Sequence, residues 1–159
     1  FPEADDAPER RAAFSDANFK ANEFAYRRLD IEDCAAAHLR AVDRAAALGF
    51  ARLILSAPTP FRPGDAAALG RDAPAVFFDR VPEARSVYTR LGWDMLPRLD
   101  RVYDARAAQA ALGWRPRHDL RAVLARAAEG RPVLSDLARA VGAKGYEGGR
   151  PARNDMPAT

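Results

Sequence analysis

Apolar and polar positions along the chain predict one long helix with a clear period. Its apolar positions recur every three or four residues and make one face, formed by Ile31, Cys34, Ala35, His38, Leu39, Val42 and Ala46. Asp30 is suited to cap the amino end of this helix, because its carboxylate can accept hydrogen bonds from the first free amides. Gly49 is suited to end it, because glycine readily takes the left-handed conformation.

Two short apolar runs flank that helix and predict strands. The first covers residues 24–29. The second is Leu53-Ile54-Leu55, which lacks alternation and is typical of a strand buried on both faces of a parallel sheet. Strand, helix and strand together have the size of a βαβ unit. A third short strand is predicted over residues 99–103.

The rest of the chain predicts short helices. We expect them over residues 63–69, 73–81, 84–91, 105–112, 119–130 and 135–141. The pattern therefore predicts an α/β fold with a lead-in loop (1–25), a βαβ portion (26–57), a small helical lobe (58–147) and a disordered tail (148–159).

Composition excludes several classes of protein. The 159 residues are 48% hydrophobic and carry a formal net charge of +3, with the two signs interleaved and no basic block. We therefore expect a globular protein that binds no nucleic acid. No apolar run approaches the roughly 20 residues that cross a bilayer, and the polar first residues do not form a signal peptide, so we expect a cytoplasmic protein. Cys34 is the single cysteine, which excludes an intrachain disulfide.

Two segments carry recognisable patterns. Residues 28–38 (RLDIEDCAAAH) form a predicted strand end, an Asp-containing turn and a helix, and Tyr103-Asp104 is followed by Leu112-Gly113-Trp114-Arg115-Pro116, which has the pattern L-G-W-x-P. The first segment resembles the strand, turn and helix of the NAD-dependent epimerase/dehydratases, the extended short-chain dehydrogenase/reductases that include UDP-glucose 4-epimerase. The second resembles that family's segment near the carboxyl end. The resemblance covers residues 26–146, about three-quarters of the chain.

The resemblance implies that the chain is the C-terminal part of a Rossmann-type enzyme, with its last parallel strands and a helical substrate-binding lobe. The complete enzyme would use NAD or NADP. This chain shows no Gly-rich turn between a first strand and a helix, and no tyrosine is followed four residues later by lysine. We therefore expect no catalytic residue, metal ligand or bound cofactor here, and we expect the N-terminal Rossmann half as a partner. A homodimer is also compatible with the family.

The resemblance also implies where a nucleotide sugar would bind. Family members grip its diphosphate with arginines, whose planar fork bonds phosphate oxygens in pairs. The matching candidates, together with two residues of a substrate-contacting loop, are Arg27, Arg28, Arg98, Arg101, Lys20 and Asn22. Tyr26 stands where the epimerases have an arginine, so the identity of the sugar nucleotide stays open.

Three other functions remain compatible with the sequence. The chain could belong to a reductase of another carbonyl substrate in the same superfamily. It could be a stand-alone helical interaction module whose basic surface meets an acidic partner. A nucleic-acid-binding function is the weakest of the three, and would require affinity that falls steeply with salt.

Overall fold

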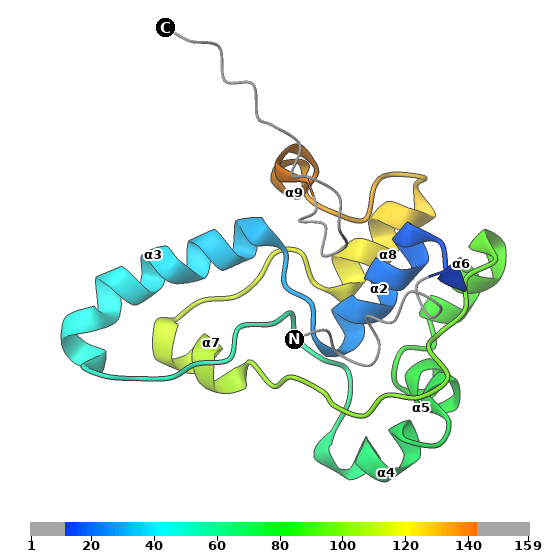
Figure 1. The fold of residues 1–159 in the computed structure, drawn as a ribbon, viewed down its shortest axis with the longest axis horizontal. Helices are drawn as coiled ribbons and strands as arrows, with labels where there is room; N and C mark the ends of the chain where they lie inside the picture. The colour runs from blue at the N-terminus through cyan, green and yellow to red at the C-terminus, as the bar shows by residue number, and fades with distance from the viewer. Residues whose placement is uncertain (1–11, 143–159) are drawn as a thin grey trace, which may run out of the picture.

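The computed structural model describes residues 12–142, and over this range the chain consists of helices and loops (Figure 1). The elements are α2 (Asp16–Tyr26), α3 (Ile31–Leu48), the 3₁₀ turn η2 (Pro63–Asp65), α4 (Ala66–Leu69), α5 (Ala73–Arg80), α6 (Ala84–Leu91), α7 (Arg106–Leu112), α8 (Leu120–Ala128) and α9 (Asp136–Val141). No residue from 12 to 142 lies in a β-strand. The predicted α/β fold, with parallel strands from a Rossmann sheet, is therefore wrong for this part of the chain.

Helix α2 replaces the first predicted strand. Ser15 caps it by accepting a hydrogen bond from the main-chain N–H of Asn18 at 3.3 Å, and Asp16 places a negative charge in the first turn. Every residue from 21 to 26 is buried. Because residues 21–26 are all buried, this end of α2 shows no alternation between buried and exposed positions, and its apolar residues read equally well as a short strand.

The other two predicted strands, residues 53–55 and 99–103, run as loops. A strand needs a repeating ladder with a neighbour, and the described residues supply none. Single main-chain bonds hold these loops instead. The N–H of Ala57 donates to the carbonyl of Arg28 at 2.8 Å, and the N–H of Tyr103 donates to the carbonyl of Tyr26 at 2.7 Å.

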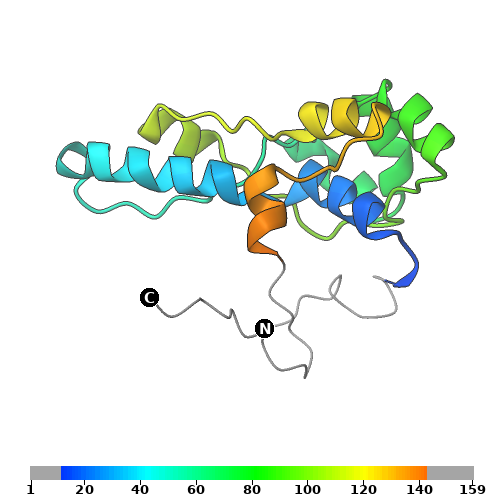
Figure 2. The ribbon, with the colours of Figure 1, turned by 90° about the horizontal axis from the view of Figure 1, so that it is seen from above.

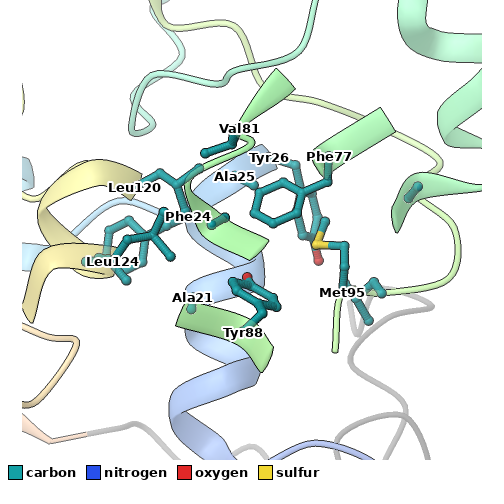
Figure 3. Packing of buried hydrophobic residues seen from close by; sticks show 14 of the residues in the cluster. Ala21, Phe24, Ala25, Tyr26, Phe77, Val81, Tyr88, Met95, Leu120 and Leu124 are labelled. Carbon is teal, nitrogen blue, oxygen red and sulfur yellow. The ribbon is translucent and has the colours of Figure 1, made fainter. Parts of the chain in front are cut away.

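Most of the core surrounds α2. Helix α8 packs against α2, and α6 packs against α8. Figure 3 shows Phe77 and Tyr88 meeting the buried face of α2 on one side and Leu120 and Leu124 meeting it on the other. The rings of Phe77 and Tyr88 lie 5.3 Å apart, centre to centre. We call α2, α4, α5, α6 and α8 the body.

Helices α3 and α7 with residues 50–57 form a second part, which we call the wing (Figure 1, left). A turn by 90° shows the wing continuing the long dimension of the body (Figure 2). Its small core contains Ala37, Leu112 and Trp114, with Leu53 and Leu55 packed against them. Gly113 ends α7 with φ at 58°, as predicted.

Helix α3 has the predicted bounds but a different orientation from the one its pattern suggests. Asp30 caps it and Gly49 follows its last residue, which confirms both predictions. Its buried residues, however, are Asp33 and Ala37, whereas Leu39 and Val42 of the predicted apolar face are 69% and 75% exposed.

No helix among residues 12–142 combines the length and the apolar character needed to cross a membrane. The predicted disordered tail (148–159) lies outside the described residues.

Candidate functional site

A cavity of about 560 Å³ lies where the body meets the wing, and it is the best candidate for a ligand site. Residues 58–69 form one wall and residues 99–109 form the other. Its apolar lining includes the buried side chains of Phe61, Leu69 and Leu99. Three arginines also line it: Arg62 on the first wall, and Arg101 and Arg106 on the second.

Two of these arginines are held by neighbouring carboxylates. Nη1 of Arg101 donates to Asp100 at 3.1 Å. Arg106 grips Asp104 with two nitrogens, Nε at 2.9 Å and Nη2 at 2.6 Å from Oδ2. The Arg106 guanidinium lowers the pKa of the Asp104 carboxyl to about 2. The Arg106 side chain is 76% exposed, and both ion pairs place a carboxylate, Asp100 or Asp104, in the cavity lining beside the arginine.

The opposite wall is held by a buried carboxylate. Oδ2 of Asp65 accepts a hydrogen bond from the main-chain N–H of Arg62 at 2.8 Å. The same carboxylate receives Nε of Arg80 at 3.0 Å and Nη2 at 2.6 Å, and the pKa of Asp65 is lowered to about 2, chiefly by these bonds. Pro58, Pro60 and Pro63 further restrict the backbone of this wall. Its shape thus depends on the Asp65–Arg80 pair.

This combination suits a ligand with an apolar or aromatic part and an anionic part. The apolar lining can bury a ring, and arginine forks bond phosphate or carboxylate oxygens in pairs. Thr59 and Gln109 add neutral polar groups to the lining. The cavity volume is within the range of small-molecule sites, which runs from about 300 to about 1,000 Å³.

The six candidate residues do not form one site. Arg101 is the only one of them that lines this cavity. Lys20 and Arg28 line a second cavity of about 370 Å³, together with Leu134 and Arg139. Arg98 is exposed and lines neither cavity.

The remaining candidates are engaged in the body. Arg27 pairs with the buried carboxylate of Glu23 at 2.6 Å, and Arg28 forms an ion pair with that carboxylate as well. Asn22 is fully buried; its amide donates to the carbonyl of Asp94 at 2.9 Å, and its Oδ1 accepts the Tyr88 hydroxyl at 2.8 Å. These contacts give Asn22 and Glu23 structural roles.

Arg62, Arg106 and Gln109 are cavity residues that sequence reasoning missed. The prolines before Arg62 predicted a constrained loop, but they did not predict that this loop lines a cavity. Arg106 lies directly after the Tyr103-Asp104 motif, so the motif pointed to this place without identifying the arginine. The juxtaposition depends on long-range contacts between the two walls, such as the main-chain N–H of Leu99 donating to the carbonyl of Leu69 at 3.0 Å, which no local pattern shows.

Asp30, Glu32 and His118 form a cluster that was not expected. One ligand-type atom from each lies within 4.8 Å of the others. Asp30 accepts hydrogen bonds from Ser135, and Nε2 of His118 lies 3.2 Å from Oε2 of Glu32. These contacts give the cluster a structural role: it joins the start of α3 to the segments before α8 and α9.

Comparison of the chain with protein-family models, with characterised proteins and with solved structures gave no match.

Proposed function

We propose that this chain supplies the substrate-binding part of an NAD(P)-dependent sugar-nucleotide epimerase or dehydratase. The cavity between residues 58–69 and 99–109 holds the nucleotide sugar, and Arg62, Arg101 and Arg106 bind its diphosphate. The observation that carries this proposal is the placement of three arginines, one on the first wall and two on the second, around one largely apolar cavity. A diphosphate offers oxygens for several guanidinium groups at once.

The resemblance of residues 103–116 supports the same assignment, because that motif contributes directly to the cavity wall. Asp104, Ala105 and Arg106 lie in the cavity lining, and α7 begins at Arg106. Predicted candidate Arg101 also lies there.

The described residues do not fit the dinucleotide cofactor. NAD(P) sites place the pyrophosphate on a Gly-rich turn between a strand and a helix, whereas this cavity is walled by Pro58, Pro60 and Pro63. The spacing G-x-x-G-x-x-G does occur at Gly142, Gly145 and Gly148. It follows α9, and Gly145 and Gly148 lie outside the described residues. We therefore assign cofactor binding and catalysis to a separate NAD(P)-binding domain and derive no chemical step here.

Calorimetric titration of the chain with UDP-glucose tests the proposal. We expect saturable binding that weakens at least tenfold in R101A, because a guanidinium contact to phosphate is lost. R98A is the matched control, since Arg98 is an exposed arginine outside the cavity. Binding that is equally weakened by both substitutions, or no binding at millimolar UDP-glucose, contradicts the proposal.

A stand-alone helical interaction module is the second candidate. The helical structure and the core that the body forms around α2 favour it. This alternative predicts that UDP-glucose does not bind and that R101A and R98A behave alike. The same titration therefore separates the two functions.

A further inference from the structure

Four arginines lie in the wing where the loop after α7 rests against α3. Arg40 and Arg44 are one turn apart on α3, at the i and i+4 positions that share a helix face. Arg115 and Arg117 belong to the loop between α7 and α8. All four residues are exposed. We call these four residues the arginine cluster.

Two contacts join the loop to α3 and place the arginines beside each other. At one end of the loop, the buried carboxylate of Asp33 accepts the main-chain N–H groups of Arg117 and of the next residue, both at 2.8 Å. At the other end, Gly113 lies next to Arg44, and a Cβ added to this glycine would be 3.3 Å from Nη2 of Arg44. The loop and the helix are thus joined at both ends of the cluster.

A cavity of about 250 Å³ lies between α3 and this loop. Arg40, Arg115 and Arg117 line it together, and Gly113, the neighbour of Arg44, lines it as well. The cavity shares no lining residue with the cavity between residues 58–69 and 99–109. Sites for drug-sized ligands run from about 300 to about 1,000 Å³, so this separate cavity suits a smaller group.

The arginine cluster carries positive charge that the described chain does not neutralise. Arg44, Arg115 and Arg117 form no ion pair with any residue from 12 to 142. Arg40 lies 3.9 Å from Asp43, and both side chains are largely exposed. An exposed pair of this kind contributes little. Because like charges one helical turn apart repel each other, an anion bound among these arginines would stabilise the arrangement.

The carboxylates that line the same cavity are engaged elsewhere. Both oxygens of Asp33 accept main-chain N–H groups of the loop. Oε2 of Glu32 lies 3.2 Å from Nε2 of His118. Neither carboxylate forms an ion pair with the arginine cluster. In this respect the cluster differs from Arg101 and Arg106, which are each paired with a neighbouring carboxylate.

We propose that the arginine cluster binds a small anion that carries phosphate groups, at a site separate from the cavity of the proposed function. Planar guanidinium groups bond phosphate oxygens in pairs, and a cleft lined by cations concentrates anions. Two linked phosphates offer oxygens to arginines of both the loop and the helix. The inference does not depend on the proposed function, because the two cavities have no residue in common.

Calorimetric titration of the full chain with inorganic pyrophosphate tests this site. R117A and R115A should each weaken binding about tenfold, because each removes one guanidinium contact to phosphate. R71A is the matched control and should leave binding unchanged. Arg71 is likewise exposed and free of an ion pair among the described residues, but it lies in the body between α4 and α5. Circular dichroism checks the fold of each variant.

Protection of arginines from phenylglyoxal provides a measurement that needs no variant. The modification rate at each arginine of the native chain is measured by mass spectrometry of its peptides, with and without pyrophosphate. Modification of Arg115 and Arg117 should slow about tenfold at saturating pyrophosphate, whereas that of Arg71 should not change.

Three outcomes overturn the proposal. The first is no saturable pyrophosphate binding, and the second is binding that R101A weakens while R115A and R117A do not. The third is an arginine cluster that polyglutamate protects and pyrophosphate does not, which would assign it to an acidic protein partner. Failure of UDP-glucose to bind the other cavity overturns the proposed function and leaves this site unaffected.

Discussion

Asp30 and Ser135 cap two different helices and also bind each other. Asp30 begins α3 and accepts the main-chain N–H of Glu32, while Ser135 begins α9 and accepts the N–H of Ala138 at 3.0 Å. The Ser135 hydroxyl donates to Oδ1 of Asp30 at 2.6 Å, and its N–H donates to Oδ2 at 3.0 Å. Both side chains are buried. This pair joins segments 105 residues apart.

We expect D30A to lower the free energy of unfolding by about 2–4 kcal/mol, because it removes three hydrogen bonds to a buried charged group and leaves their donors unsatisfied. S135A should cost about 1–2 kcal/mol, as the loss of a helix cap with one further bond. Urea unfolding followed by circular dichroism measures both. Ordinary surface substitutions change stability by up to about 0.5 kcal/mol. A smaller loss than that in D30A would show that the Asp30–Ser135 pair contributes little to stability.

Acid should weaken the wall of the cavity through Asp65. Its pKa is lowered from 3.8 to about 2 by Arg80 and by the N–H of Arg62. A carboxyl with a lowered folded-state pKa stabilises the fold above its unfolded pKa, and that contribution is lost as pH falls through the folded value. We therefore expect the urea midpoint to fall between about pH 4 and pH 2.

D65N should be less stable than the native chain at pH 7, and the difference should shrink between about pH 4 and pH 2. D43N is the matched control, because the Asp43 side chain is 66% exposed on α3. Urea midpoints measured at pH 7, 4, 3 and 2 provide the comparison. A constant difference between D65N and the native chain across this range would contradict the assigned role of Asp65.

Asn22 should affect stability but not ligand binding. Its amide joins α2 to the carbonyl of Asp94 and to the Tyr88 hydroxyl inside the body. N22A should lower the free energy of unfolding by about 1–3 kcal/mol, because it leaves buried polar groups unpaired. Its affinity for UDP-glucose should stay within twofold of the native value. A tenfold loss of affinity in a folded N22A would contradict this structural role and support the substrate-binding role predicted from the sequence.

Gly113 should resist substitution. Its φ is 58°, and a Cβ there would lie 3.3 Å from Nη2 of Arg44. G113A should cost about 1–2 kcal/mol, because the left-handed conformation is unfavourable for residues with a Cβ. G64A is the control, since Gly64 has no atom within 4 Å of its added Cβ and no positive φ. Thermal unfolding measures the midpoint temperature of both variants. Equal decreases in G113A and G64A would contradict this role of Gly113.

The sequence predicted helices well where a cap and an amphipathic stripe coincide, as in α3 and α8. It failed where these signals are missing or misleading. Residues 24–26 are buried on every side of α2, so their pattern carried no period. In residues 53–55, Leu53 and Leu55 pack against the wing core, whereas Ile54 between them is 55% exposed. Apolar runs of this length do not distinguish a strand from a packed loop.

Of the six substrate-binding residues predicted from the sequence, one, Arg101, lines the candidate cavity. The motif at residues 103–116 begins in the second wall of the cavity, and Arg101 lies on the same wall. Arg27 and Arg28 follow α2 and bind Glu23, which the sequence could not show because the assignment of residues 24–29 to a strand concealed their i,i+4 and i,i+5 relationship to Glu23. Arg62 is separated from Arg101 by 39 residues, and only the tertiary contact between the two walls, which includes the hydrogen bond from the N–H of Leu99 to the carbonyl of Leu69, brings them to one cavity.

The location of bound UDP-glucose tests the central claim most directly. A crystal structure of the chain with UDP-glucose should place the diphosphate within hydrogen-bonding distance of Arg101 and at least one of Arg62 and Arg106. A diphosphate held instead by Lys20 and Arg28 in the second cavity, or by neither cavity, would contradict the account.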